Sequence, residues 1–165
     1  LVELMAGSIQ VASQKGRGTT FSVNLPLKQT EQQAVEQSGE QGLIPNLTSK
    51  CILVAEDNEI NRLVVLNMLE PTNATVHFAV DGEKAVASYQ KYRPDLVLMD
   101  IQMPNMDGIE ACRQIKAMNG RVPVIALTAS VMREDIESYS SAGFDGYLGK
   151  PMDLPLLYKA LHQVV

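Results

Sequence analysis

Short apolar runs recur along the last two-thirds of the chain, and each is followed by a stretch with helical spacing. The first run is Cys51-Ile52-Leu53-Val54-Ala55, and further strands are predicted at about residues 75–79, 96–99, 124–127 and 146–148. The spacing of apolar residues predicts helices over about residues 60–69, 82–91, 108–118, 133–142 and from 154 onward. Runs that are apolar throughout favour a parallel sheet covered on both faces. Right-handed crossovers then give a doubly wound α/β sandwich, with Asp107 and Asp153 placed to cap the third and fifth helices.

The N-terminal part of the chain has a different pattern. Residues 1–6 are typical of a last helical turn that stops at Gly7. Residues 9–13 and 21–25 alternate apolar and polar side chains around a glycine-rich turn, which predicts a β-hairpin. Residues 28–49, rich in Gln, Glu, Ser and Gly, are predicted to be a flexible linker. We therefore expect a hairpin remnant over 1–27, a linker over 28–49 and a domain over 50–165. A start inside a helical pattern without methionine suggests a piece of a longer protein.

Composition narrows the functions that this chain can have. The net charge is -5 and the pI is near 5.0, without the clustered Lys and Arg that nucleic-acid binding needs. No apolar run approaches the roughly 18 residues that span a bilayer, so we expect no membrane contact by these residues. Cys51 and Cys112 lack metal or redox spacing. We expect a reducing, cytoplasmic setting.

Polar side chains follow four of the five predicted strands. Glu56 and Asp57 come after the first, Asp100 after the third, Thr128 after the fourth and Lys150 after the fifth. In open parallel sheets, ligands bind outside the carboxyl ends of strands, where the strand order reverses. With the order 2-1-3-4-5, that point lies between strands one and three, so these five side chains become neighbours.

Three neighbouring carboxylates repel one another and therefore require a cation. A hard divalent ion with oxygen ligands fits, and Mg²⁺ is the usual one beside phosphate. Asp100 is then the candidate nucleophile, because a carboxylate accepts a phosphoryl group as a mixed anhydride. Lys150 and Thr128 would stabilise the phosphoryl oxygens by charge and by a hydrogen bond.

Four motifs carry a close resemblance to a known family. Glu56-Asp57-Asn58, the segment from Met99 to Gly108, Leu127-Thr128-Ala129 and the segment from Tyr147 to Pro151 resemble the motif set of the response-regulator receiver domains, in order and on the expected strands. The resemblance implies a flavodoxin-like fold and a phosphoacceptor on Asp100, with Lys150 and Thr128 as its catalytic partners.

The same resemblance implies roles that the spacing alone does not give. Mg²⁺ would be bound by Glu56, Asp57, Asp100 and the backbone carbonyl of Gln102. Thr128 and Tyr147 would form a conformational switch, although Tyr147 taken alone also fits a half-buried core aromatic. The Lys150–Pro151 bond would be cis.

The first 27 residues resemble the closing end of a histidine-kinase ATP-binding domain. Leu1 to Gly7, Gly16-Arg17-Gly18-Thr19-Thr20-Phe21 and Leu25-Pro26-Leu27 carry this resemblance, and the main nucleotide-binding boxes of that family are absent from it. Kinase tail, linker and receiver is the layout of a hybrid sensor histidine kinase. It implies a phosphodonor kinase domain in the same parent chain, a histidine phosphotransfer protein or domain as acceptor, and a parent anchored in the inner membrane. This piece would not itself be an enzyme beyond slow self-dephosphorylation.

Two other classes of function remain open from the residues alone. A phosphatase of the haloacid-dehalogenase type also uses an aspartyl phosphate, but its nucleophile follows the first strand in an Asp-x-Asp motif, where this chain has Glu56-Asp57-Asn58. A phosphorylation-independent interaction module is the other alternative, and the complete acidic set argues against it. Gly16 and Gly18 fit turn chemistry better than a phosphate loop.

Overall fold

A computed structural model of the chain describes residues 7–16, 18–24, 26, 44–129 and 133–164. The chain divides into two compact units, Leu1–Glu36 and Gln37–Val165. The predicted helical turn at residues 1–6 and most of the predicted linker lie outside the described residues. The smaller unit contains a hairpin, and the larger unit contains the α/β domain.

The larger unit alternates strands and helices as the apolar runs predict. The strands are β3 (Cys51–Ala55), β4 (Thr75–Ala79), β5 (Leu96–Asp100), β6 (Val124–Thr128) and β7 (Gly146–Gly149). The helices are α1 (Glu59–Leu69), α2 (Gly82–Tyr92), α3 (Gly108–Met118), α4 (Arg133–Ala142) and α5 (Leu154–Val164), with a 3-10 turn, η3 (Glu70–Thr72), after α1. All neighbouring strands are parallel and lie in the order β4-β3-β5-β6-β7. This order confirms the predicted doubly wound, flavodoxin-like fold.

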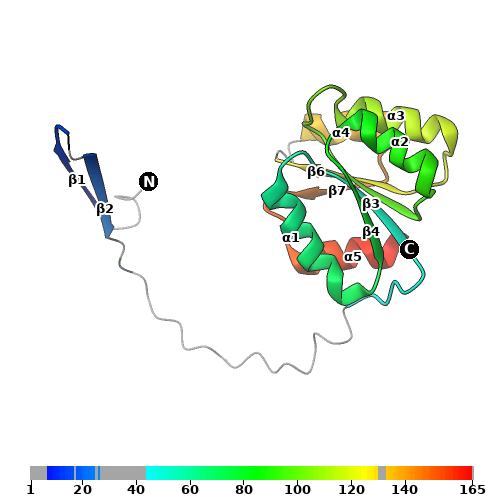
Figure 1. Ribbon diagram of the computed structural model, residues 1–165, viewed down its shortest axis with the longest axis horizontal. Coiled ribbons are helices and arrows are strands. Elements are labelled where there is room, and N and C mark those ends of the chain that lie inside the picture. The colour runs from blue at the N-terminus through cyan, green and yellow to red at the C-terminus, as the bar shows by residue number, and fades with distance from the viewer. Residues whose placement is uncertain (1–6, 17, 25, 27–43, 130–132, 165) are drawn as a thin grey trace. The chain divides into compact units, whose positions relative to one another are not determined.

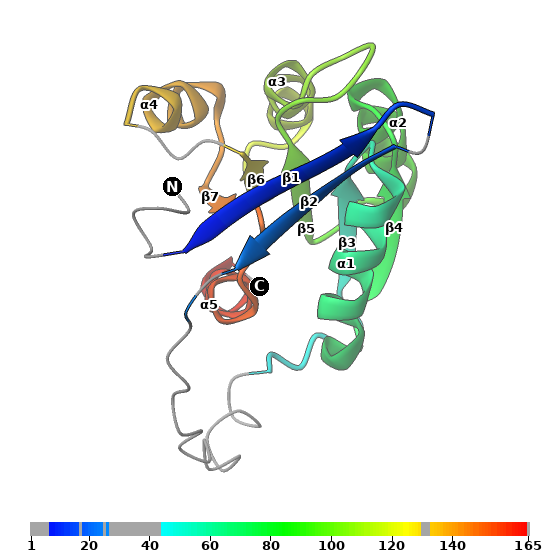
Figure 2. The ribbon, with the colours of Figure 1, turned by 90° about the vertical axis from the view of Figure 1, so that its left-hand side faces the viewer.

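Helices cover both faces of the sheet (Figures 1 and 2). One hydrophobic cluster joins Leu53 and Met99 to the buried sides of α2, α3 and α4. The other joins Ile52 and Leu98 to α1 and α5. Alternate residues of each strand point to opposite faces, so burial on both sides requires strands that are apolar throughout. Each fully buried aliphatic side chain contributes about 1.5–3 kcal/mol relative to exposure.

Short polar side chains cap the helices that follow the strands. The caps are Asn58 for α1, Asp81 for α2, Asp107 for α3 and Asp153 for α5. Asp107 Oδ1 accepts from the backbone N–H of Glu110 at 2.8 Å, as predicted. The Glu110 carboxylate accepts a hydrogen bond from Gln114 on the next turn. Each cap satisfies N–H groups that a helix leaves unpaired, which contributes about 1 kcal/mol.

The folded unit begins earlier than the predicted boundary at residue 50. Leu47 is buried, and its backbone N–H donates to the carbonyl of Thr72 at 2.7 Å. The N–H of Lys50 in turn donates to the carbonyl of Leu47 at 2.9 Å. A single leucine in a polar stretch gives no periodic signal, so its packing against η3 could not be predicted from the pattern.

The smaller unit is the predicted antiparallel hairpin. Strands β1 (Ser8–Gln14) and β2 (Gly18–Asn24) pair with Ile9 opposite Val23 and Val11 opposite Phe21. These four apolar side chains are exposed. At the turn, Gly16 has φ +84°, a conformation that glycine adopts without strain. The hairpin thus presents an apolar strip.

Candidate phosphoacceptor site

The predicted site residues meet in one cleft at the carboxyl ends of the strands. Glu56 and Asp57 come from the end of β3, Asp100 from β5, Thr128 from β6 and Lys150 from β7. All five line an open cleft of about 510 Å³. Gln102, the predicted source of a backbone ligand, also lines it. The structure therefore brings together every sequence-predicted residue except Tyr147.

The Lys150 ammonium bridges two buried carboxylates. Lys150 Nζ lies 2.7 Å from Asp100 Oδ2 and 2.5 Å from Glu56 Oε2. Glu56 is only 1% exposed, and its other oxygen accepts from the side-chain amide of Asn61 at 2.9 Å. Buried charges persist only when they are paired and hydrogen-bonded. Lys150 is consequently held directly beside the candidate nucleophile.

Burial and charge act in opposite directions on the two partners of this ion pair. Burial raises the pKa of the Asp100 carboxyl above its ordinary value, and the hydrogen bond and charge of Lys150 offset that only in part. Burial disfavours the Lys150 ammonium, but its hydrogen bonds and charge interactions with Asp100 and Glu56 together outweigh burial and raise its pKa. Lysine faces two carboxylates, whereas Asp100 faces one cation and the like charge of Glu56. The ammonium therefore stays protonated at neutral pH.

The donor set fits a hard divalent cation. Carboxylate oxygens of Glu56, Asp57 and Asp100 lie within 4.8 Å of one another. Asp57 is exposed, whereas the other two carboxylates are buried. Three oxygen ligands at this spacing, open to solvent on one side, suit an ion such as Mg²⁺ that keeps several waters.

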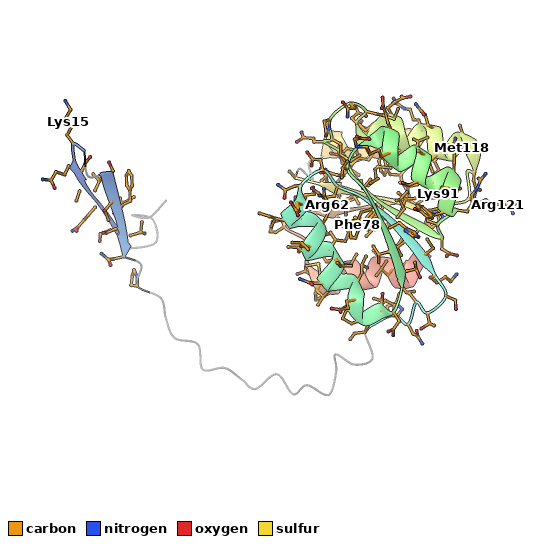
Figure 3. The ribbon with its side chains drawn as sticks, viewed as in Figure 1. Lys15, Arg62, Phe78, Lys91, Met118 and Arg121 are labelled. Carbon is orange, nitrogen blue, oxygen red and sulfur yellow. The ribbon has the colours of Figure 1, made fainter. Side chains whose placement is uncertain are left out.

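The backbone around the site is fixed by close packing and by one arginine. Arg62, labelled in Figure 3, donates to the carbonyls of Glu56 at 2.9 Å and Asp57 at 2.8 Å. Gly108 lies against the backbone of Asp100, where a Cβ would overlap the carbonyl oxygen. The backbone N–H of Gln102 donates to Asp100 Oδ1 at 3.2 Å. These contacts hold both acidic loops in place. The Lys150–Pro151 bond is cis, as the resemblance implied.

The two predicted switch residues lie in different surroundings. Thr128 is buried in the cleft, and its Oγ1 is 2.9 Å from the hydroxyl of Tyr139 on α4. Tyr147 is 44% exposed on β7 and lines two separate hollows. Its role as a switch stays a prediction.

Sequence reasoning assigned no role to several residues that line the cleft. Asn58 and Asn61 enter from the start of α1, Ile109 from α3, and Ser138 and Tyr139 from α4. Asn58 was visible as a cap signal before a helix, but Tyr139 lies in a polar helical stretch with no motif around it. Its contact with Thr128 depends on how α4 packs.

The fold and this acidic, lysine-bridged cleft define a phosphoacceptor class of signalling domain. The family described as the response regulator receiver domain matches residues 52–162. The chain therefore belongs to the response-regulator receiver domains, the phosphoacceptor modules of two-component phosphorelays.

Curated relatives of the chain are sensor proteins and sensor kinases. The chain is 35% identical over 169 residues to the sensor protein EvgS of Escherichia coli K12, covering 99% of this chain and 14% of EvgS. It is 33% identical to the aerobic respiration control sensor protein ArcB of the same strain, covering 95% of this chain and 20% of ArcB. The chain thus spans a fifth or less of these relatives. No helix in the described part is long and apolar enough to cross a membrane.

Solved structures give the same class. The receiver domain of the sensor histidine kinase PA1611 from Pseudomonas aeruginosa PAO1, with a magnesium ion in its active-site cleft, is 38% identical. Its TM-score is 0.65, with 70% of this chain and 96% of that chain covered. The chemotaxis protein CheY4 of Vibrio cholerae is 29% identical, with a TM-score of 0.67 and coverage of 70% and 98%.

Proposed function

We propose that Asp100 accepts a phosphoryl group from a phosphohistidine, with Lys150 and Thr128 stabilising the group. The observation that supports this most strongly is the convergence of the carboxylate, the ammonium and a hydroxyl in one cleft. Asp100 is only 6% exposed, so few water molecules have to leave its carboxylate before it attacks phosphorus.

The step exchanges one bond for another. The phosphorus–nitrogen bond of the phosphohistidine breaks, and its electron pair stays with the imidazole. A phosphorus–oxygen bond forms to the Asp100 carboxylate. The Lys150 ammonium neutralises a phosphoryl oxygen and the Thr128 hydroxyl donates to another, because phosphoryl transfer depends mainly on positioning and charge stabilisation.

Glu56, Asp57 and Asp100, with the backbone carbonyl of Gln102, are the residues that would hold Mg²⁺. When bound, the ion neutralises charge on the carboxylates and on the phosphoryl oxygens. Glu56 is oriented by Asn61 and Lys150, so its geometry is set by the protein before any ion arrives.

The acceptor is tested with a small phosphodonor such as phosphoramidate. We expect a Mg²⁺-dependent, base-labile gain of one phosphoryl group by intact mass, abolished in Asp100→Asn. Asp95→Asn is the matched control, since Asp95 precedes the opposite end of the same strand. Phosphorylation that persists in Asp100→Asn would refute the assignment, and turnover of phosphate esters would instead favour a phosphatase.

We further propose that the partner docks on an α1 patch formed by Ile60, Leu63 and Val64. These side chains share one face of α1 and are exposed, Ile60 by 71%. The same helix contributes Asn61 to the cleft, so the patch borders the site. A helix that presents a phosphohistidine among apolar side chains would fit here, as in a histidine phosphotransfer domain or the kinase of the same parent chain. Contiguous exposed apolar surface of this kind is typical of interaction sites.

Ile60→Ser separates docking from chemistry. We expect it to slow transfer from a phosphorylated histidine phosphotransfer domain by about tenfold, while phosphorylation by phosphoramidate is unchanged. Leu156→Ser is the control, because it removes another exposed aliphatic side chain, 54% exposed, from α5. If Ile60→Ser slowed phosphorylation equally with phosphoramidate and with the histidine phosphotransfer domain, the patch would support the fold and would not bind the partner.

We propose that residues 1–27 are the closing end of a histidine-kinase ATP-binding domain, in a parent with the layout of a hybrid sensor kinase anchored in the inner membrane. The exposed pairs Ile9–Val23 and Val11–Phe21 support this, because such a strip needs a larger sheet or core to cover it. The alignment with EvgS extends over 99% of the chain, beyond the receiver match. Deleting residues 1–43 should leave the urea midpoint of the receiver unchanged, and a lower midpoint would contradict the assignment.

A further inference from the structure

The loop that follows the candidate nucleophile is tied to the start of a neighbouring helix. This β5–α3 loop, residues 101–107, joins the strand that ends at the nucleophile to α3. Near its tip, the side-chain amide of Asn105 donates to Asp81 Oδ2 at 3.2 Å. Beside that contact, the backbone N–H of Gly82 donates to the carbonyl of Met106 at 3.0 Å. These two hydrogen bonds form a clasp between the loop and the first turn of α2.

Asp81 divides its two carboxylate oxygens between the helix and the loop. The residue is 3% exposed. Its Oδ1 accepts from the backbone N–H of Lys84 at 2.7 Å, which is the cap of α2. Its Oδ2 accepts from Asn105 and lies 3.4 Å from the Lys84 ammonium. A serine caps a helix about as well as an aspartate does, so the second oxygen has a task beyond capping.

The backbone on both sides of the clasp adopts a demanding geometry. Asn105 has φ +64°, in the left-handed region that residues with a Cβ rarely adopt, although asparagine does so more readily than most. Gly82 approaches the loop so closely that a Cβ would overlap the Met106 carbonyl oxygen. Backbone strain of this kind persists where surrounding contacts maintain it, and it is concentrated near functional sites.

The clasped loop also carries the Gln102 carbonyl, which is the proposed backbone ligand of Mg²⁺. The N–H of Gln102 donates to Asp100 Oδ1 at 3.2 Å, so this peptide lies directly beside the nucleophile. At the base of the loop, the N–H of Gly108 donates to the carbonyl of Ile101 at 2.9 Å. The loop is therefore closed at its base and held near its tip, and a shift of the tip would move the Gln102 peptide.

We propose that Asp81 is a positioning residue for Mg²⁺, which acts through Asn105 to hold the β5–α3 loop so that the Gln102 carbonyl stays available to the cation. Asp81 does not itself line the cleft. Partners that orient a metal ligand from behind commonly set the affinity of the site. The inference rests on the proposed function, in which the acidic cleft holds Mg²⁺ beside Asp100.

A double-mutant cycle in the full chain tests the proposal. The variants are Asp81→Ser, which keeps a cap for α2, Asn105→Gly, which keeps the left-handed conformation, and the two together. The measurement is the Mg²⁺ dissociation constant, taken from backbone amide chemical shifts of isotope-labelled protein titrated with Mg²⁺. We expect each single change to raise the dissociation constant about tenfold. The second change should add less than about twofold once the first is present.

Asn119→Gly is the matched control. Asn119 ends α3 at the opposite end of the strands from the cleft, and its Oδ1 accepts from the backbone N–H of Arg121 at 3.1 Å. Both asparagine variants lose one loop hydrogen bond and gain a glycine, so their urea midpoints without Mg²⁺ should fall alike. The Mg²⁺ dissociation constant should rise in Asn105→Gly and stay unchanged in Asn119→Gly.

Phosphorylation by phosphoramidate separates cation binding from chemistry. Asn105→Gly should slow the reaction at low Mg²⁺, because less of the protein then holds the ion. At saturating Mg²⁺ the rate should return to within about twofold of the unaltered protein, since the variant has lost binding and not the reacting groups.

Each outcome supports or overturns the proposal. Effects of Asp81→Ser and Asn105→Gly that multiply in the pair would mean that the two residues act separately. An unchanged Mg²⁺ affinity in either single variant would mean that the clasp serves the fold alone, and slowing that persists at saturating Mg²⁺ would mean that it acts on Asp100. Any of these results, with Asp100 of the unaltered chain still phosphorylated, overturns this inference alone. If Asp100 of the unaltered chain takes up no phosphoryl group, the proposed function fails and this inference fails with it.

Discussion

Replacing Lys150 by methionine tests how far one ammonium holds the acidic cleft together. The ammonium lies within 2.7 Å of Asp100 and 2.5 Å of Glu56, and methionine keeps much of the length while removing the charge. Without it, the carboxylates of Glu56, Asp57 and Asp100 still lie within 4.8 Å of one another, but the ammonium that bridges two of them is gone. We expect Lys150→Met to lower the free energy of unfolding in the absence of divalent ions.

The magnitude follows from the burial of the partners. Removing one member of a buried ion pair costs roughly 3–5 kcal/mol. Lys150 is 21% exposed and Asp100 can take up a proton because its pKa is already raised, so part of this cost is relieved. We expect a loss of about 2–3 kcal/mol, which moves a urea midpoint by about 1–2 M for a domain of this size.

Magnesium should reduce this loss. A cation bound by the three carboxylates replaces the missing charge, and a ligand that binds only the folded state stabilises it according to its affinity. Without a competing ammonium, the ion should bind the variant more tightly, by about fivefold or 1 kcal/mol. The assay is urea unfolding of both proteins in chelator and in saturating Mg²⁺.

Lys50→Met is the control for loss of a lysine. Lys50 pairs with Asp95 at 3.5 Å on the surface, and exposed pairs of this kind contribute about 0–1 kcal/mol. It should change the midpoint little and identically with and without Mg²⁺. The reasoning is refuted if Lys150→Met is as stable as the unaltered protein in chelator, or if Mg²⁺ leaves the difference between them unchanged.

Three other predictions concern the fold around the site. Gly108→Ala would force a Cβ into the Asp100 carbonyl, so it should lower the free energy of unfolding in urea by about 1–3 kcal/mol and slow phosphorylation. Gly146→Ala, which has open space around it, should change neither quantity. Hydrogen bonding to the α2 backbone holds the pKa of Asp81 below its ordinary value, so Asp81→Ala should lower the free energy of unfolding by about 1 kcal/mol at neutral pH. Part of this difference between the two proteins should vanish as the pH falls below about 4, because Asp81 of the unaltered protein then becomes protonated. An unchanged difference down to acid pH would contradict that. Burial raises the pKa of Cys112 to about 11, so peptide mass analysis should find Cys112 unalkylated by iodoacetamide until urea unfolds the chain.

The part of the site that the sequence predicted is the part fixed by topology. Strands β3, β5 and β6 are buried on both faces, so their apolar runs ended visibly at Glu56, Asp100 and Thr128. A parallel sheet places those ends on one edge whatever the side-chain details. The strand order and the meeting of the five strand-end residues therefore followed from pattern and motif.

The part that could not be predicted depends on how helices are oriented. Tyr139 reaches Thr128 only because α4 packs with this tyrosine inward, and its ten-residue stretch is too polar for an apolar face to reveal that. Leu47 was likewise hidden, since one buried leucine carries no period. Tyr147 shows the converse: the motif identified the residue, but β7 leaves it 44% exposed.

The bridge between Lys150 and Glu56 joins residues 94 positions apart. During synthesis from the N-terminus, all three carboxylates and Thr128 leave the ribosome before the lysine that neutralises two of them. Domains fold largely as units. Here the last strand of the receiver, β7, is followed by the ammonium that the carboxylate after its first strand, β3, requires. Until β7 and Lys150 have been made, the nascent domain therefore has its acidic strand ends but lacks the ammonium that neutralises two of them. The domain becomes a competent phosphoryl acceptor only when almost all of it has been translated.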